Sequence, residues 1–434
     1  MERFDYGSKD TFYAFIRTGM NMSSGLFQTL MGKIESKKAI IGILGAGFVG
    51  YNLGLLTSKK GFTTLGLDKD LSKTRAIEEK KIPHFHATND LSQIGSADII
   101  IITVPTLIYE DKHPNLKPLE DAAALLKKHI KKGQLVILES TLAPGMTKEV
   151  LIDPICRDHM QPGVDFFVGY SPERIDPGNP TYTIENTPKI VSGWNDLSRL
   201  LTKAFYEKIV DQVVSVSSIE VAEFAKMLEN IVRFMMINLM NEMESYAVKK
   251  KINLWEVIDA AATKPFGFFP CYPSAGIGGH CIPVNLYYLL EDADKIGINC
   301  AILKEAASFH ERRIASVVDR AFEIVKDKTA HPRIFILGVA IKPESTNTAE
   351  SVGLKMLRLI EKKGGKGAYH DPFVPQIGTW TSLPMTKEVL EKQDLFLIIT
   401  DHKEIDFLKL LAFHKPIIDT KNVFPKEENG IYRV

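Results

Sequence analysis

The sequence places a cysteine, Cys281, at the end of the glycine-rich stretch GIGGHC. Such a loop exposes backbone N–H groups and leaves room for a substrate beside the sulfur. Next to a nicotinamide, a thiolate can trap an aldehyde as a thiohemiacetal, which is oxidised to a thioester and then hydrolysed. Most free cysteines are instead small buried hydrophobic residues. The loop alone leaves both interpretations equally open.

Polar residues in three other stretches could serve the same chemistry. Lys226 and Asn230 are one turn apart in an expected helix, so the lysine can stabilise an alkoxide while the amide fixes a water or hydroxyl. Thr141 follows the strand-like run QLVILES, at the sheet edge where ligands of open α/β folds bind. Glu173, in SPER, offers a carboxylate as a base. A solvated helix face is the alternative for the first pair, and the apolar neighbours of Lys226 weaken it.

The stretch GAGFVG fits the dinucleotide pattern G-x-G-x-x-G between a strand-like and a helical run. Gly45 allows the tight turn, Gly47 lets the backbone approach a pyrophosphate, and Gly50 lets the helix pack closely on the strand. Phe48 and Val49 begin that helix, whose first N–H groups and dipole attract phosphate. The pattern predicts a dinucleotide site.

Asp68 closes the next strand-like run, TTLGLD, where a carboxylate takes the ribose hydroxyls of the cofactor. An acid there repels a 2′-phosphate, which favours NAD over NADP. Thr106, after the run ADIIIITVP, is expected to face the same crevice. The alternative is a purely structural βαβ unit with a solvated aspartate, but context and spacing favour NAD and hydride chemistry.

The elements that must position these residues follow an α/β, helical, α/β plan. Apolar strand-like runs alternate with helical stretches from residue 38, which predicts a doubly wound parallel sheet of the Rossmann type. A helix without proline or glycine is expected across 218–250, buried on two sides, and a second Rossmann-like section begins at RIFILGVA. We expect four segments: a lead-in helix in 1–37, an NAD-binding domain over 38–217, a central helical domain with the cysteine loop over 218–328, and a C-terminal Rossmann-like α/β domain over 329–434.

Bulk composition narrows the function classes. The chain has 434 residues, 45% hydrophobic and 25% charged, and a net charge of +1. This charge gives no case for nucleic acid or an anionic membrane as partner. Its 4 cysteines lack zinc-type CxxC spacing, so no metal site is predicted, and scattered thiols favour a reducing compartment. The polar start MERFDYGSKD does not read as a signal peptide, so the cytoplasm is the expected location.

Taken together, the chain resembles the UDP-glucose/GDP-mannose dehydrogenase family from about residue 38 to 425. The matching stretches, in the family's order, are GAGFVG, TVPT, ESTLAPGMT, SPERIDPGN, AEFAKMLEN, TKPFGFFP, GIGGHCIPV and ILGVAIKP. The cysteine loop GGHCIP is similar to the branch that oxidises UDP-N-acetylhexosamines. SPERIDPGN with TKPFGF is most similar to UDP-N-acetylglucosamine 6-dehydrogenases.

The resemblance implies oxidation of the sugar C6 alcohol to a carboxylate with two NAD and one water, for surface polysaccharide synthesis. By position it makes Cys281 the nucleophile, Lys226 the oxyanion partner, Asn230 and Thr141 the groups that position water, and Glu173 the base. It also implies a homodimer or larger assembly built on the long helix. The resemblance makes the C-terminal segment, 329–434, the UDP-sugar-binding domain. Further residues that it assigns to substrate binding are Lys264, Phe266, Gly278 and Lys342.

This sequence departs from the family pattern at several positions. Asn285 stands where the family usually has an aspartate that assists deprotonation, and an amide cannot take a proton. Ala349 replaces a usual arginine, Met236 a usual asparagine, and Ser274-Ala275 a usual Gly-Pro. General-base assistance is worth roughly two to four powers of ten in rate, so Asn285 matters most.

Three readings compete with a UDP-N-acetylglucosamine enzyme. A weakened paralogue could bind nucleotide sugar and NAD as a sensor or partner subunit, which Asn285 and Ala349 motivate. A UDP-N-acetylmannosamine or UDP-glucose dehydrogenase would share most motifs. A one-step dehydrogenase would leave Cys281 without a role, so it ranks last. Retention of Cys281, Lys226 and Glu173 favours the two-step enzyme.

Overall fold

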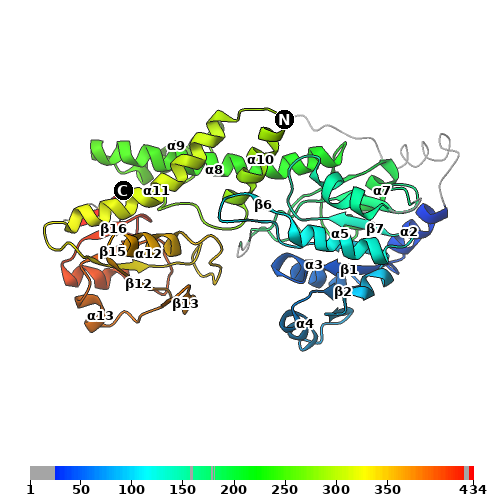
Figure 1. Ribbon diagram of the computed structural model, residues 1–434, viewed down its shortest axis with the longest axis horizontal. Coiled ribbons are helices and arrows are strands. Elements are labelled where there is room, and N and C mark those ends of the chain that lie inside the picture. The colour runs from blue at the N-terminus through cyan, green and yellow to red at the C-terminus, as the bar shows by residue number, and fades with distance from the viewer. Residues whose placement is uncertain (1–24, 157–159, 177–178, 180, 425–429) are drawn as a thin grey trace. The chain divides into compact units, whose positions relative to one another are not determined.

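The structure is a computed structural model that describes residues 25–156, 160–176, 179, 181–424 and 430–434. The chain divides into two compact units (Figure 1). The described residues up to Thr106, with Leu116–Phe224, form the first unit, and Leu107–Asn115 with Ala225–Val434 form the second.

The first unit contains an eight-stranded sheet in the order β10-β9-β8-β7-β4-β1-β2-β3. Neighbouring strands are parallel, as the sequence predicts, except that β8 and β9 pair antiparallel. The strands are β1 (Ile40–Leu44), β2 (Thr63–Leu67), β3 (Phe85–Thr88), β4 (Ile99–Ile102), β7 (Leu135–Leu138), β8 (Phe167–Tyr170), β9 (Lys189–Gly193) and β10 (Val213–Ser215).

Strands β4 and β7 consist only of buried Ile, Leu and Val, which suits β-branched and apolar runs between two helical layers. The core of this unit also takes in Phe27, Leu30 and Ile34 of the first described helix, so that helix packs as part of the unit. Its helices are α2 (Gly25–Glu35), α3 (Phe48–Lys59), α4 (Leu71–Glu78), α5 (Lys117–His129), α6 (Asp153–Ile155) and α7 (Asp196–Tyr206), with helical turns η1 (Leu91–Ser96) and η2 (Lys148–Ile152).

The second unit contains a five-stranded parallel sheet in the order β12-β11-β15-β16-β17. Helices α11 and α12 pack on it through Ile314, Val317 and Met356 (Figure 1). Its strands are β11 (Arg333–Leu337), β12 (Lys366–His370), β15 (Leu395–Ile398), β16 (Ile417–Asp419) and β17 (Ile431–Tyr432), and a small hairpin joins β13 (Gln376–Ile377) to β14 (Trp380–Thr381). Its helices are α9 (Leu254–Ala262), α10 (Ile282–Lys295), α11 (Ala301–Val325), α12 (Val352–Lys362) and α13 (Lys387–Glu391), with the turn η3 (Phe407–Phe413).

Helix α8 (Ile219–Lys250) realises the predicted long helix, and the boundary between the units falls after Phe224 within it. Of the described helices, none is long and apolar enough to cross a membrane.

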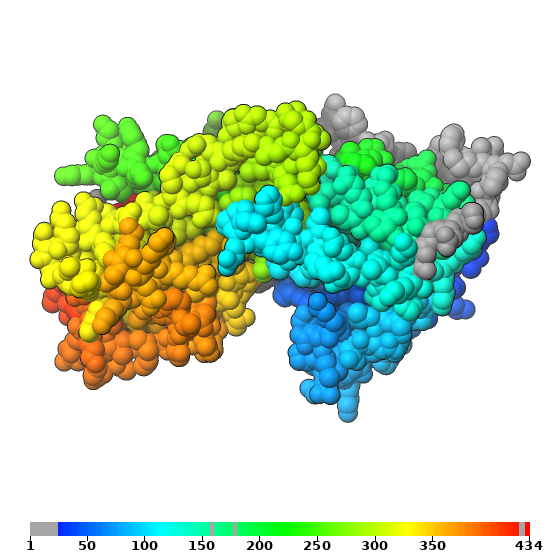
Figure 2. Space-filling view, in the orientation of Figure 1, coloured from blue at the N-terminus to red at the C-terminus, as the bar shows by residue number. Residues whose placement is uncertain are grey.

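A short hairpin, β5 (Leu107–Ile108) and β6 (Pro114–Asn115), belongs to the second unit although it follows β4 in sequence. Figure 2 shows it as the light-blue surface against the yellow-green helices. The Tyr288 hydroxyl of α10 donates to the Leu107 carbonyl at 3.0 Å, and His113 pairs with Glu291 at 3.0 Å. These polar contacts explain why the hairpin groups with α10.

Candidate active site

The glycine turn between β1 and α3 has the geometry that its pattern predicts. Gly45 has φ +102°, and a Cβ there would lie 3.0 Å from the Thr103 carbonyl oxygen. A Cβ on Gly50 would collide with the Gly45 carbonyl, whereas one on Gly47 would meet no atom within 4 Å. The space beside Gly47 and the N-terminus of α3 therefore fit a pyrophosphate, the group that NAD would place there.

Asp68 follows β2 and is buried. Its Oδ2 accepts a hydrogen bond from the Ala46 amide at 3.0 Å, and its Oδ1 accepts one from Asp70 at 2.9 Å. Lys73 approaches Oδ2 at 3.4 Å. The turn and the carboxylate are thus joined directly. Phe48 and Val49, which begin α3, are exposed and half-buried respectively.

Thr106 and Thr141 follow the neighbouring strands β4 and β7 and are half-buried. The Ser140 hydroxyl donates to the Val104 carbonyl at 2.6 Å, which ties these strand ends together. Parallel pairing puts both threonines at the carboxyl edge of the sheet that also carries the glycine turn.

Two carboxylates near this edge have different surroundings. Glu139 is fully buried, pairs with the Lys189 ammonium at 2.8 Å and accepts a hydrogen bond from Tyr206, so it serves the core. Glu173 is half-buried, and its side chain accepts from the Ile175 amide. Of the two, only Glu173 is partly accessible.

Glu223 is a residue that sequence reasoning missed. It lies one turn inside the start of α8, is fully buried, and accepts hydrogen bonds from the Gly145 amide at 2.7 Å, the Thr147 amide at 2.9 Å and the Thr147 hydroxyl at 2.5 Å. Burial raises its pKa to about 7 despite these bonds. It anchors the loop that follows Thr141. In the sequence it is one glutamate among several on a helix, so no local pattern distinguishes it.

In the second unit, Lys226 and Asn230 lie one turn apart on α8 and are 6% and 7% exposed. The Asn230 Nδ2 has no hydrogen-bond partner among the described residues. A buried amide donor of this kind suits a ligand or water, because an unsatisfied buried donor costs about 1–3 kcal/mol.

Cys281 is exposed and occupies the N-cap position of α10, after a loop in which Gly276 has φ +156° and Gly279 has φ +93°. Asn285 lies one turn further and is 4% exposed. Its backbone N–H donates to the Cys281 carbonyl at 3.3 Å. The Asn285 Nδ2 also has no partner among the described residues. Cys281 and the side-chain amide of Asn285 therefore both lie in the first turn of α10.

The other predicted substrate residues lie in two places. Lys264 and Phe266 occupy the exposed segment after α9, with the ammonium 4.9 Å from the ring centroid. Gly278 packs against the loop that contains Lys342: a Cβ on Gly278 would lie 3.1 Å from Ile341 Cγ2. The C-terminal sheet and the cysteine loop thus meet within one unit.

His310 on α11 was not singled out from the sequence, because it lies in an ordinary amphipathic pattern. It is 1% exposed, its ring packs edge-on against Phe234 at 5.5 Å, and neither ring nitrogen has a partner among the described residues. Burial lowers its pKa to about 4. It is therefore neutral near neutral pH. Phe234 is one turn beyond Asn230 on α8, so His310 borders the buried polar face of that helix.

Each unit thus carries one group of the predicted site residues. The first unit holds the glycine turn, Asp68, Thr106, Thr141 and Glu173, and the second holds Lys226, Asn230, Lys264, Phe266, Gly278, Cys281, Asn285 and Lys342.

Three family models match consecutive parts of the chain. They describe the UDP-glucose/GDP-mannose dehydrogenase family: its NAD binding domain over residues 39–210, its central domain over 220–312 and its UDP binding domain over 335–426. The chain belongs to this family. It is accordingly an oxidoreductase that uses NAD, and Lys342 lies in its UDP binding domain.

Similar proteins include enzymes for two sugar epimers. The UDP-N-acetyl-D-glucosamine 6-dehydrogenase of Pseudomonas aeruginosa is 31% identical over 352 residues, 77% of this chain and 83% of that protein. The UDP-N-acetyl-D-mannosamine dehydrogenase of Pyrococcus horikoshii is 28% identical and covers 90% of this chain and 97% of its own length. A solved structure of the UDP-D-ManNAc dehydrogenase from P. horikoshii has a TM-score of 0.81 at 25% identity, covering 91% of this chain and 98% of that one.

Proposed function

We propose that this family member oxidises the C6 alcohol of a UDP-N-acetylhexosamine, with UDP-N-acetylglucosamine the foremost candidate, to the uronic acid. Two NAD and one water are consumed per sugar, and two NADH are released with the carboxylate. The observation that carries the proposal is Cys281, exposed at the start of α10, in a chain whose first unit has a dinucleotide turn with its aspartate. The product would supply surface polysaccharide synthesis in the cytoplasm.

Bound NAD would accept hydride from the sugar carbon in both oxidation steps. The chain's residues do the remaining work. Cys281 as thiolate attacks the aldehyde carbon, so that the second hydride leaves a thioester on its sulfur. The N-terminus of α10 favours this thiolate, because the helix dipole stabilises negative charge there.

Lys226 and Asn230 are proposed to hold the oxygen that carries negative charge in each step. Both are buried, which strengthens an ammonium-oxyanion interaction relative to water. Thr141 is proposed to position the hydrolytic water and Glu173 to take its proton. The Asn285 amide can orient that water or the sugar hydroxyl but cannot accept a proton. The first proton is therefore expected to leave through an ordered water, or through Lys226 where its side chain is present as the neutral amine.

The deciding experiment incubates the protein with NAD and a panel of UDP-sugars: glucose, N-acetylglucosamine, N-acetylgalactosamine and N-acetylmannosamine. We expect two NADH per molecule of one N-acetylhexosamine. One NADH per sugar, or none with any sugar, refutes the proposal. Cys281→Ala should abolish turnover, and Cys300→Ala is the matched control because Cys300 also caps a helix, α11, in the same unit.

We also propose that the active form is a homodimer through α8. In the second unit this helix exposes an apolar row of side chains, each between 37% and 60% exposed: Leu228, Val232, Leu239, Met243 and Tyr246. A continuous exposed apolar surface of this kind marks an interaction site. Light scattering should give twice the mass of the chain, and Leu239→Glu should reduce it to that of a monomer. A wild-type monomer that turns over refutes the dimer.

A further inference from the structure

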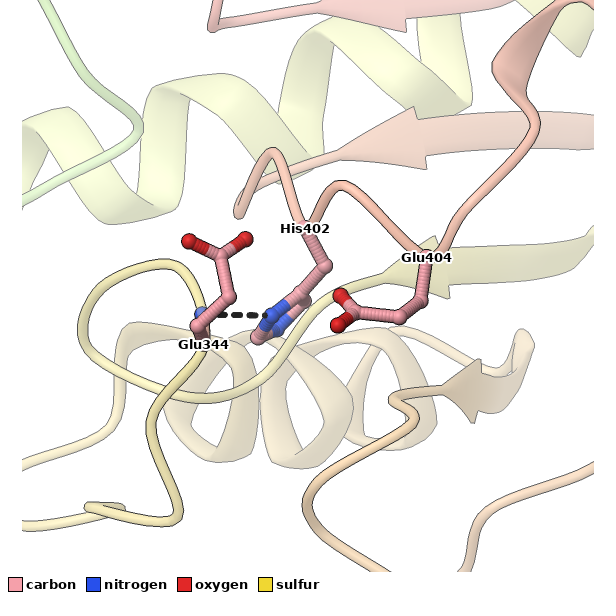
Figure 3. A group of neighbouring side chains, drawn as sticks. All are labelled: Glu344, His402 and Glu404. Carbon is pink, nitrogen blue, oxygen red and sulfur yellow. Dashed lines mark hydrogen bonds between the residues drawn. The ribbon is translucent and has the colours of Figure 1, made fainter.

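A cluster of side chains in the second unit contains none of the proposed catalytic or binding residues. Glu344, His402 and Glu404 bring one ligand atom each within 4.8 Å of one another (Figure 3). Such a trio could suggest a metal site, and the bonding of the histidine decides the matter. The Glu344 backbone amide donates to His402 Nδ1 at 3.1 Å, as the dashed line in Figure 3 shows. A backbone N–H can only donate, so Nδ1 is an acceptor without a proton.

The other nitrogen of His402 is occupied as well. Nε2 lies 3.1 Å from Oδ2 of Asp371 and, in this tautomer, carries the proton that it donates. Both side chains have no exposed surface. Neither nitrogen keeps a lone pair for a cation, so the cluster is not a metal centre. Its bonds instead join three segments: the end of β12, the segment after β15 and the loop after β11.

Asp371 organises this junction. Its Oδ2 accepts from the Val339 amide at 2.7 Å and the Ala340 amide at 2.9 Å, in addition to His402. Its Oδ1 accepts from the Phe373 amide at 2.9 Å and from the amide of residue 374 at 3.0 Å. With five donors a carboxylate has filled its acceptor sites.

A similar construction occurs in the first unit. Asp68 follows β2 and holds the Ala46 amide of the first glycine turn, as Asp371 follows β12 and holds the turn after Gly338. Asp371 has no capacity left for a ribose diol. In the second turn the aspartate therefore holds its own loop.

The loop so held, residues 339–350, packs on the cysteine loop. The Gly279 amide donates to the Ala349 carbonyl at 2.9 Å, and Ile341 fills the space beside Gly278, where a Cβ would lie 3.1 Å away. Lys342 belongs to this loop and follows Ile341 directly. Any movement of the loop therefore moves the supports of both the proposed nucleotide contact and the loop of the proposed nucleophile, Cys281.

We propose that Asp371 and His402 are positioning residues, which fix loop 339–350 and through it set both the affinity for the UDP group and the reactivity of Cys281. This rests on the proposed function, because it assumes that Lys342 binds the nucleotide and that Cys281 reacts. The partner is the diphosphate and uridine portion of the substrate, for which UDP alone is a sufficient probe.

The test compares His402→Phe with wild type and with Thr420→Val. Thr420 is buried beside the same sheet, and its hydroxyl donates to the Ile398 carbonyl at 2.8 Å, so its loss matches a buried hydrogen bond without touching the loop. The measurements are the Kd for UDP by calorimetry, the Kd for NADH by fluorescence, and the rate of Cys281 alkylation by iodoacetamide followed by mass spectrometry.

For His402→Phe we expect the Kd for UDP to rise at least about tenfold and the alkylation rate to change at least about threefold, while the Kd for NADH stays within twofold. Thr420→Val should leave all three within twofold, and His402→Gln, able to keep one of the two bonds, should fall between. A folded His402→Phe with unchanged UDP affinity and alkylation overturns the inference, as does an equal loss in Thr420→Val.

If the variants do not fold, hydrogen exchange in the wild-type protein tests the same contact. The Glu344 amide, bonded to His402, should exchange its hydrogen slowly and more slowly still with UDP bound. Rapid exchange in both states overturns the inference. A wild-type protein that binds no UDP instead overturns the proposed function, and the exchange and alkylation measurements without ligand still test the clamp.

Discussion

The buried His310 gives the most quantitative prediction. Its pKa is lowered to about 4, chiefly because burial disfavours the charged ring, while neighbouring charges act in both directions. Glu311 and Glu350 raise the pKa, whereas Lys355 and Lys112 lower it. Because the folded protein resists protonation of this ring, the unfolded chain binds a proton more readily, and acid must lower the free energy of unfolding.

The sign and size follow from the two pKa values. The contribution of His310 to stability is intact above the unfolded pKa of about 6.5 and is lost as the pH falls toward the folded value of about 4. At about 1.4 kcal/mol per pH unit, the full loss is about 3 kcal/mol. By pH 5 the loss is already about 2 kcal/mol, because most of the interval has been crossed.

The perturbation is His310→Phe, which keeps a ring against Phe234 and removes the titration. Urea unfolding near pH 7.5 and near pH 5 is followed by tryptophan fluorescence in a Trp194→Phe background, so that Trp255 and Trp380 report on the second unit. As the pH falls from about 7.5 to about 5, the parent loses about 2 kcal/mol that the variant does not lose. The free energy of unfolding of the variant minus that of the parent should therefore rise by about 2 kcal/mol.

The control is His331→Phe, which replaces an exposed histidine of the same unit with the same residue. Like His310→Phe, it removes one titrating histidine from the unfolded chain, but it does not change a buried ring. A difference between the variant and its parent that is equal at both pH values refutes the reasoning, because it would mean that the buried ring is protonated or that its site opens to water.

Other predictions concern the proposed reaction directly. Asp68→Asn removes the charge that repels a 2′-phosphate, so the ratio of kcat/KM for NAD to that for NADP should fall about tenfold or more; an unchanged ratio contradicts the assignment. Glu223→Gln places a side-chain N–H against a backbone N–H that now donates to the carboxylate, so it should lower the free energy of unfolding by about 1–3 kcal/mol and lower kcat. Glu220→Gln, at an exposed position one turn earlier, should change neither quantity. Asn285→Asp supplies the missing base and should raise kcat by about tenfold or more; an equal or lower rate means that protons leave by another path.

The sequence predicted the fold well, because strands buried on both faces of a parallel sheet are continuous apolar runs. Runs such as IIII in β4 and LVIL in β7 carry no polar residue, and each is followed by a helical stretch. The antiparallel step at β9 escaped prediction, since pairing direction depends on a connection over the residues between β8 and β9 and leaves no mark on the strand itself.

The residues of the candidate site also differ in whether the sequence alone could propose them. Residues that the proposed chemistry requires, such as Cys281 and Asp68, stand in short local patterns, so the sequence alone proposes them as candidates. Residues whose role depends on what another segment brings beside them have no such pattern and were not proposed. Glu223 is a clamp only because residues 145–147 lie beside it, and His310 is unusual only because three-dimensional packing buries it.

Asp68 and Asp371 each follow the second strand of a sheet, yet this shared local pattern does not predict which of them can bind a ligand. Asp68 and Asp371 follow equivalent strands and accept amide N–H groups from equivalent turns. What separates them is His402, which comes from a third strand segment and completes the bonding of Asp371. The carboxylate with remaining acceptor sites can take a ribose, and the saturated one can only hold protein. A strand-ending aspartate therefore predicts a dinucleotide only after its other partners have been counted.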